Sequence, residues 1–197
     1  MLNERQKTST MKKLGILIGT MLISIFAFAQ EISVNTDLSE LKWTGKKVTG
    51  EHWGYIQLKD ASLSVKNNQI QSGVFKIDME SINNQDIESE KTNAQLIGHL
   101  KSDDFFSVDK YPVATLKIKE STPFKNGFAE IKANLTIKGI THPISFKAEQ
   151  LVNGYKAKIT VDRTKYNVRY GSGKFFDNLG DNMIYDDFTL DVKIITE

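Results

Sequence analysis

An alternation of apolar and polar residues with a period of two recurs along most of this chain. In residues 128–138 the apolar positions are Ala129, Ile131, Ala133, Leu135 and Ile137, and polar residues stand between them. The same pattern occurs in residues 61–65, 74–81, 114–119, 144–149, 155–161 and 188–194. Successive side chains of a β-strand point to opposite faces of a sheet, so each segment predicts a strand with one apolar and one polar face.

Short turn signals link these segments into hairpins. Asn126-Gly127 and Asn153-Gly154 each separate two alternating runs, which is typical of two-residue hairpin turns. Counting residues 166–170 as a short strand, the sequence predicts eight or nine strands. Such a sheet must close on itself or pack on another, and no boundary for a second domain is visible. We therefore predict an all-β fold, an antiparallel eight-stranded barrel, with residues 171–182 as a loop at its mouth.

Residues 95–112 break the alternation. Leu96, Ile97 and Leu100 fall on one face of a short helix, adjacent aromatics follow at Phe105 and Phe106, and a proline opens the next strand-like run. We expect this helical insert to close one end of the barrel. Gly98 weakens an isolated helix by about 1 kcal/mol relative to alanine, so it is expected to be held by packing or by a close approach of another backbone.

The first 29 residues have the pattern of a signal peptide. Lys12 and Lys13 precede an apolar run over residues 14–26, and Ala27-Phe28-Ala29 resembles a cleavage site. An uncleaved anchor is the alternative, although the run is short for a membrane span, which needs about 20 apolar residues. We expect a leader over residues 1–29, cleavage after Ala29 and a single domain over residues 30–197.

Removal of this leader changes the charge balance. The leader holds four basic residues and one acid, so of 26 basic and 24 acidic residues the mature domain keeps 22 and 23, a net charge of −1. The basic character of the whole chain therefore gives no support to a nucleic-acid partner. The absence of cysteine excludes disulfides, a lipid-modified N-terminal cysteine and thiolate metal sites. We therefore expect the protein to be periplasmic or secreted.

The apolar face of the predicted barrel has two interpretations. An eight-stranded barrel is either filled by its own side chains or holds one small ligand. Many inward positions are small, namely Ala61, Ala114, Ala129, Ala133, Ala148 and Ala157. A hollow apolar interior favours a ligand of methylene or isoprene units, at about 0.8 kcal/mol per buried CH₂. From the alternation alone, a solid core stays equally open.

Several motifs together resemble the YceI-like proteins. They are residues 50–54 (GEHWG), 75–79 (FKIDM), 98–102 (GHLKS), 104–106 (DFF), 111–112 (YP), 135–139 (LTIKG) with Thr141 and Pro143, and 162–163 (DR). The resemblance runs from about Val34 to the C-terminus. One departure is Asn167, where the family often has glycine. The resemblance implies a lipocalin-like barrel in the bacterial periplasm, with a hydrophobic tunnel for prenyl quinones, prenyl phosphates or, in some members, fatty acids or their amides.

The polar candidates suggest contacts to a ligand head group rather than catalysis. His52 and His99 fall in the family motifs and are expected to touch a head group or to make structural hydrogen bonds, while His142 before Pro143 is expected in a turn. No histidine pair has metal-ligand spacing, and no nucleophile motif is present, so we predict neither a metal site nor an enzyme.

Two arginines complete this set of candidates. Arg163 and Arg169 are the only arginines of the mature chain, and either could hold a phosphate. A local ion pair between Asp162 and Arg163 is the favoured alternative, because ion pairs of this kind are common.

The leading functional prediction is a carrier that binds a long-chain isoprenoid lipid non-covalently, for transport, storage or sequestration. A fatty acid or fatty amide carrier, an envelope interaction module with a solid core and a lipid-acting hydrolase or isomerase are the alternatives. A transient membrane contact and a homodimer stay open. The expected tunnel residues are Phe75, Ile77, Met79, Leu96, Ile97, Leu100, Phe105, Phe106, Leu116, Ile118, Ile131, Leu135, Phe146 and Ile159.

Overall fold

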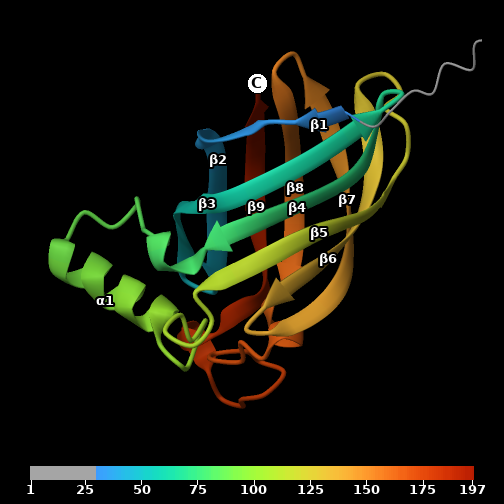
Figure 1. Cartoon of the computed structure of the whole chain (residues 1–197). Coiled ribbons are helices and arrows are strands. Elements are labelled where there is room, and N and C mark those ends of the chain that lie inside the picture. Colours follow the sequence, from blue (N-terminus) through green and yellow to red (C-terminus); the bar gives the residue numbers. More distant parts are fainter. Residues whose placement is uncertain (1–29) are drawn as a thin grey trace, which may run out of the picture.

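The computed structural model describes residues 30–197, and the predicted leader with its cleavage site after Ala29 lies outside these residues. The described part forms one antiparallel sheet with a single α-helix beside one end (Figure 1). Its strands are β1 (Gln30–Ile32), β2 (Val34–Lys47), β3 (Gly50–Lys66), β4 (Gln69–Asp78), β5 (Val113–Ser121), β6 (Phe128–Ile137), β7 (Ile140–Leu151), β8 (Gly154–Asp162) and β9 (Ile184–Thr196).

The sheet closes into a barrel of eight strands, β2 to β9. Each strand pairs with its neighbours in chain order, β9 pairs with β2, and β3 pairs with β4. The short β1 pairs with the far end of β3, where Gln30 lies opposite Val65. The predicted all-β, antiparallel eight-stranded barrel is therefore confirmed.

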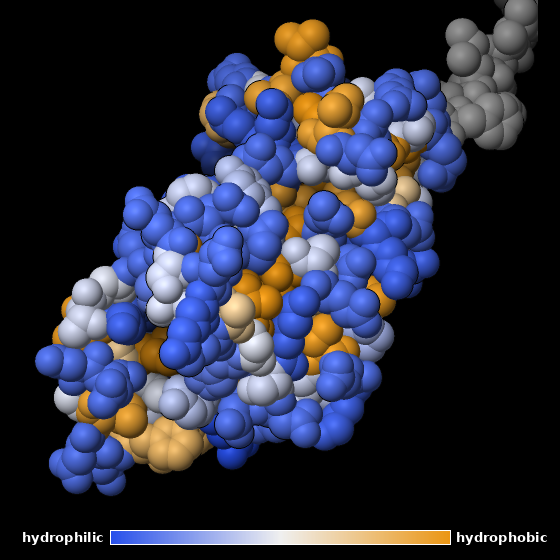
Figure 2. All heavy atoms as spheres, turned by 90° about the vertical axis from the view of Figure 1, so that its left-hand side faces the viewer, coloured by the Kyte–Doolittle hydropathy of each residue, from blue (hydrophilic) through white to orange (hydrophobic). Residues whose placement is uncertain are grey.

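Burial follows the alternation that the sequence shows. In β6 the residues Ala129, Ile131, Ala133, Leu135 and Ile137 are buried, while Glu130 and Lys132 between them are exposed. The apolar faces of the strands thus meet inside the barrel. Hydrophilic residues cover most of the face shown in Figure 2, with smaller hydrophobic patches between them.

One end of the barrel, which we call the helix end, is closed by the insert and by the segment after β8. Helix α1 (Glu90–Lys101) starts at Ser89, whose side chain accepts a hydrogen bond from the Thr92 backbone N–H, and only Leu100 of the helix is buried. The residues after the helix complete the closure, since Phe105, Phe106 and Val108 are buried. The insert therefore closes one end as predicted, mainly through residues 100–108.

Gly98 does not have the environment that the sequence suggests. A Cβ atom built at this glycine meets no atom within 4 Å, so neither packing nor another backbone requires glycine here. The close backbone approach occurs at Gly54 instead, where a Cβ would lie 2.0 Å from the carbonyl oxygen of Asn83.

Residues 166–170 are not a strand. The 3₁₀ helix η2 (Arg163–Tyr166) begins where the Asp162 carboxylate accepts a hydrogen bond from the Thr164 backbone N–H at 3.0 Å. It ends at Asn167, whose φ of +59° lies in the left-handed region. Asparagine tolerates this region better than most residues, so the departure from the family's glycine is compatible with the turn.

The barrel has two further 3₁₀ turns among residues 30–197. They are η1 (Met79–Ser81) after β4 and η3 (Gly180–Asn182) within the loop before β9. His142 lies inside β7, so its expected place in a turn is wrong; the turn before β7 uses Lys138 and Gly139, both with positive φ. Within residues 30–197, no helix has the length and apolar character that crossing a membrane requires.

Candidate functional site

The inward side chains enclose two adjoining apolar cavities with volumes of about 110 and 90 Å³. We call them the helix-end chamber and the mid-barrel chamber. Four residues line both, and they mark the waist between the chambers: Leu41, Ile77, Leu135 and Leu190. The strands of these residues are spread around the barrel, so the waist is a ring rather than a partition.

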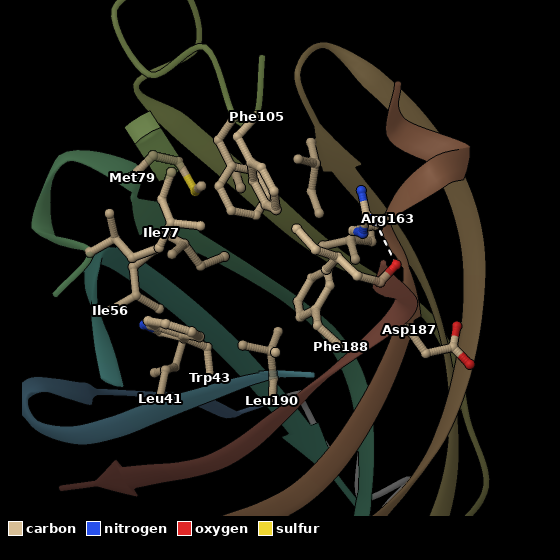
Figure 3. A pocket seen from close by; sticks show the side chains of 18 of the residues that line it. Leu41, Trp43, Ile56, Ile77, Met79, Phe105, Arg163, Asp187, Phe188 and Leu190 are labelled. Carbon is tan, nitrogen blue, oxygen red and sulfur yellow. Dashed lines mark hydrogen bonds between the residues drawn. The ribbon is translucent and has the colours of Figure 1, made fainter. Parts of the chain in front are cut away.

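The helix-end chamber lies between the strands and the closing segments. Figure 3 shows apolar side chains such as Trp43 of β2, Met79 of η1 and Phe188 of β9 pointing towards one another. The Trp43 indole N–H donates to the carbonyl oxygen of Asn83 at 2.9 Å, so its polar atom is satisfied outside the cavity. The other apolar lining residues are Ile56, Ile82, Leu100, Phe105, Phe106, Ala114, Ile137 and Ile184.

The mid-barrel chamber extends towards the opposite end, the turn end, where the hairpin turns at residues 66–69 and 151–154 lie. Its further lining residues are Leu58, Leu63, Ile70, Phe75, Leu116, Ile118, Ile131, Phe146, Ala148, Tyr155, Lys156, Ala157, Ile159, Val192 and Ile194. Tyr155 is stacked on Phe124 with a ring-centroid distance of 5.5 Å. Burial raises the pKa of the Tyr155 phenol, so this hydroxyl stays neutral at physiological pH.

Three of the six small inward alanines contribute to the hollow interior. Ala114, Ala148 and Ala157 line the chambers. Ala61, Ala129 and Ala133 do not, and Ala129 and Ala133 are fully packed. The inward side chains of Leu190 and Val192 keep partial accessibility although they point into the barrel. The barrel is therefore packed in places and hollow along its middle.

Among the described residues 30–197, Arg163 is the one basic side chain that is buried, at 2% exposure, and it lies at the helix end. Its guanidinium donates to the carbonyl oxygens of Tyr185 at 3.1 Å, Ile184 at 3.0 Å and Val168 at 2.8 Å. Burial lowers the pKa of Arg163, and nearby Asp186 and Asp162 oppose that shift. The guanidinium thus ties β9 to the segment after β8 with three of its five N–H donors, and Arg163 also lines the helix-end chamber.

The prediction of an ion pair between Asp162 and Arg163 is wrong. Asp162 lies 3.1 Å from the ammonium of Lys174 and accepts hydrogen bonds from Thr164. Burial raises the pKa of Asp162, but the hydrogen bonds from Thr164 and Lys174 outweigh it and lower the pKa overall. The closest carboxylate to Arg163 is Asp186 at 3.9 Å. Arg169 is exposed, with its guanidinium 4.7 Å from the Phe175 ring centroid.

The two candidate histidines lie outside the chambers. The Nδ1 of His52 is 2.7 Å from the Asp86 carboxylate, so it links β3 to residues 82–87. The His99 ring packs against Phe105 and Tyr170, with centroid distances of 5.7 and 4.4 Å. Both make structural contacts, and neither lines a cavity.

Of the expected tunnel residues, twelve line a chamber, whereas Leu96 and Ile97 pack against the core from α1 without lining either cavity. Sequence reasoning missed the contributions of β2 and β9, above all Leu41, Trp43 and Leu190. The alternation in residues 41–43 and 188–194 held the signal for them.

The chemistry of the chambers is that of an apolar container. Arg163, Asp187 and Lys156 border them, but the Arg163 guanidinium donates to backbone carbonyls and the Asp187 carboxylate points away from the cavity in Figure 3. Within residues 30–197, no three His, Cys, Asp or Glu side chains are grouped so as to hold a metal ion. The lining is almost wholly apolar, so the arrangement can enclose a hydrocarbon chain.

Comparisons with known proteins agree with this geometry. The sequence profile described as "YceI-like domain" matches residues 33–196. A UPF0312 protein of Pseudomonas paraeruginosa is 34% identical over 110 residues, which cover 55% of this chain and 54% of that protein. A UPF0312 protein of Vibrio cholerae is 32% identical over 106 residues, covering 50% and 52%. The chain thus spans about half the length of the curated relatives that it matches.

Solved structures share the fold at low sequence identity. BcnA of Burkholderia cenocepacia superposes with a TM-score of 0.62 at 20% identity, covering 84% of this chain and all of that one. A polyisoprenoid binding domain from Saccharophagus degradans, implicated in plant cell wall breakdown, gives 0.55 at 15% identity, covering 86% and 99%. At these identities the likeness concerns the fold alone.

Proposed function

This chain belongs to the YceI-like domain family, and on that basis we propose that it is a binding protein that holds one long apolar lipid chain inside its barrel. The observation that carries the proposal is the pair of adjoining cavities with an apolar lining. Each CH₂ group moved from water into such a site contributes about 0.8 kcal/mol, so a chain that fills both chambers binds tightly without a polar anchor.

The volume of the chambers indicates the size of the chain. A water-sized group needs roughly 10–15 Å³ of cavity measured with a water-sized probe. The chambers of about 110 and 90 Å³ therefore accept roughly 13 to 20 groups of methylene size. This matches a fatty acyl chain or an isoprenoid of three to four units. A longer prenyl chain needs a wider barrel or an opening for the remainder.

We favour an isoprenoid, with a fatty acid or fatty amide as the second candidate. Support for the isoprenoid comes from the printed description of the Saccharophagus degradans domain, and support for the fatty chain comes from the cavity volume. Binding for transport, storage or sequestration in the periplasm or outside the cell also belongs to this proposal, through the signal-peptide pattern of residues 1–29. The solid-core interaction module is disfavoured by the two chambers.

Extraction and identification of co-purified lipid tests the proposal directly. Native mass spectrometry of the purified protein is expected to show a bound species that organic solvent removes, and the stripped protein is expected to take up a prenyl quinone or a fatty acid. Leu190→Trp fills the waist and should abolish stoichiometric uptake while the protein stays folded. Val152→Trp, at a fully exposed turn position, is the matched control.

Two outcomes would overturn the proposal. One is a stripped, folded protein that takes up neither class of lipid. The other is uptake that Leu190→Trp and Val152→Trp affect equally, because binding would then take place outside the chambers.

A further inference from the structure

The barrel wall is incomplete between β7 and β8. Their ladder has four residue pairs, from Leu151 opposite Gly154 to Ala148 opposite Ala157, whereas the β6–β7 ladder has ten. Beyond this ladder the two strands do not pair: residues 143–147 of β7 make no ladder pair with residues 158–162 of β8. Both strands stay paired on their other sides, β7 with β6 and β8 with β9. We call these two unpaired segments the seam.

The seam has a defined length. It is closed at the helix end by His142, whose Nε2 lies 3.0 Å from the carbonyl oxygen of Lys165 and whose ring packs on Tyr166. At the other end it is closed by the pair of Ala148 and Ala157. Five residues of extended chain span roughly 16 Å, enough for several methylene or isoprene units lying side-on.

Pro143 agrees with an unpaired edge. Proline has no N–H, so it fits a strand only where that N–H would face away from the neighbouring strand. Residue 143 pairs with Asn134 in the unbroken β6–β7 ladder, so its missing donor belongs to the side that faces β8. Proline and lysine are also the residues that keep exposed strand edges from pairing with other chains, and Lys147 and Lys158 stand at the seam.

The seam separates the interior from a groove on the outer surface. Phe146 and Ile159, one from each side of the seam, line the mid-barrel chamber. Outside lies a groove of about 590 Å³, lined in part by Lys147 and Lys158. The chamber and the groove share Lys156, Ala157 and Val192. The two spaces are therefore neighbours across β8 and β9 next to the closed end of the seam, and Phe146 and Ile159 separate them along the seam itself.

The ends of the barrel are better closed than the seam. At the helix end Phe106, Val108 and Val168 are buried, and Arg163 holds its carbonyl partners. At the turn end Leu63 and Phe124 are buried. Opening either end exposes packed side chains or breaks hydrogen bonds, whereas parting the seam breaks no ladder hydrogen bond.

We infer that the seam between β7 and β8 is the entrance through which a single-chain lipid with an anionic head enters the chambers from the side, its head staying in the outer groove. This inference rests on the proposed function and adds the route and the class of head group. An added β-strand is a poorer occupant, because Pro143 and the lysines oppose strand pairing.

The charged side chains of the groove are the reason for assigning an anionic head group to it. Four lysines and three acids line it, and Lys156 and Lys158 are paired with Glu149 at 3.1 Å and Asp191 at 3.4 Å. Within residues 30–197, Lys147 has no carboxylate within 4.0 Å and lies over the Phe128 ring at 4.1 Å. A carboxylate or phosphate head emerging from the seam would meet Lys147 on one side and Lys158 on the other.

Cross-linking across the seam tests the entrance. The chain has no cysteine, so Ser145→Cys with Thr160→Cys gives one unique thiol pair across the seam. Thr160→Cys with Thr189→Cys is the matched control, since Thr160 and Thr189 are opposite each other in the paired β8–β9 ladder. In both proteins the two cysteines are joined by a short cleavable cross-linker that carries two thiol-reactive groups. Uptake of parinaric acid and of its methyl ester is then followed by fluorescence, both as a rate and at equilibrium.

We expect the link across the seam to slow uptake about tenfold or more, with little change at equilibrium, and cleavage of the link to restore the rate. The control link should leave the rate unchanged. Lys147→Gln with Lys158→Gln should weaken equilibrium binding of the acid about threefold at low salt and leave the ester unaffected. Lys117→Gln with Lys119→Gln, at exposed positions of β5, makes the same change in charge and should affect neither probe.

Each contrary outcome has its own meaning. An unchanged rate in the protein linked across the seam, with normal binding at equilibrium, overturns the entrance. Equal losses for the acid and the ester in the lysine variant overturn the head-group site. Failure of the wild-type protein to bind either probe at equilibrium overturns the proposed function, and with it this inference.

Discussion

Arg163 shows how a single residue fixes the helix end of the barrel. Among residues 30–197 it is the only charged residue that is buried, and its guanidinium donates to three backbone carbonyls. A buried carbonyl without a donor costs about 1–3 kcal/mol, so these acceptors depend on Arg163. The residue therefore helps to close the helix end, and a contact between its remaining N–H groups and a ligand head group stays a prediction.

Replacement of Arg163 by methionine is expected to lower the free energy of unfolding by about 3 kcal/mol or more, because it leaves the carbonyls of Tyr185, Ile184 and Val168 without their donor. Urea denaturation measures the change. Arg169→Met is the control, and its exposed guanidinium should contribute less than about 1 kcal/mol. Equal effects of the two substitutions would contradict the structural role of Arg163.

Asp86 makes the stability of the folded state depend on pH in the acid range. Its carboxylate accepts hydrogen bonds from the Trp53 backbone N–H at 2.8 Å and the Asn84 amide at 2.6 Å, and it lies 2.7 Å from His52. Burial raises the pKa of Asp86, but these hydrogen bonds together outweigh it, so the pKa falls below its ordinary value of 3.8. The folded state thus binds this proton more weakly than the unfolded chain does.

The sign of the pH dependence follows from this lowered pKa. The contribution of Asp86 to stability is fully present above the unfolded pKa and is lost as the pH falls through the folded pKa. Asp86→Asn should therefore lower stability at neutral pH and flatten the decline below pH 3.8. Thermal unfolding between pH 7 and pH 2.5 measures both effects. An acid limb as steep as that of the wild type would show that other carboxylates dominate.

At the scale of elements, residues 82–87 form a loop that is hydrogen-bonded to β3. The Asn83 backbone N–H donates to the Tyr55 carbonyl at 3.0 Å, and the Gln85 N–H donates to the Trp53 carbonyl at 2.9 Å. This segment reaches β3 only because Gly54 lacks a side chain. The polar run that the sequence marks as a loop is therefore fixed to the barrel wall.

Two glycine-to-alanine substitutions should act in opposite directions. At Gly54 a Cβ would lie 2.0 Å from the Asn83 carbonyl oxygen, so Gly54→Ala should cost about 2 kcal/mol or more by displacing residues 82–87. At Gly98 a Cβ has open space, so Gly98→Ala should stabilise the protein by up to about 1 kcal/mol through helix propensity. Chemical denaturation compares both variants with the wild type. If Gly98→Ala destabilised the protein, the space around the added methyl group at residue 98 would not be open.

The elements that the sequence predicts well are those with a long alternation. Strands β6, β8 and β9 follow from it because every second residue is apolar over several positions. Residues 166–170 misled the prediction, since their aromatic residues favour a strand while the Asp162 cap and Asn167 enforce a 3₁₀ turn. The sequence predicts a turn at His142 because Pro143 follows it, whereas an unpaired edge admits proline within a strand.

At the scale of the whole molecule, closure of the sheet decides which residues share a cavity. The strand pattern predicts which side chains point inwards, and most of the expected tunnel residues do line a chamber. Leu96 and Ile97 do not, because the direction of α1 relative to the barrel is a tertiary property. The seam was equally invisible, since both of its strands have regular alternation and only the length of their ladder reveals it.

The combined volume of the chambers predicts a limit to chain length. For a series of saturated fatty acids, affinity should rise by about 0.8 kcal/mol, or about fourfold, for each added CH₂ while the chain still finds space. The rise should level off at roughly 13 to 20 carbons, where the chambers are full. Ala114→Ile adds three carbons in the helix-end chamber and should move that limit down by about three. Thr115→Ile, at the next, outward position of β5, should leave it in place. Competition against a fluorescent fatty acid measures the series, and affinity that keeps rising beyond about twenty carbons would mean that the chain leaves the chambers, as an open seam would allow.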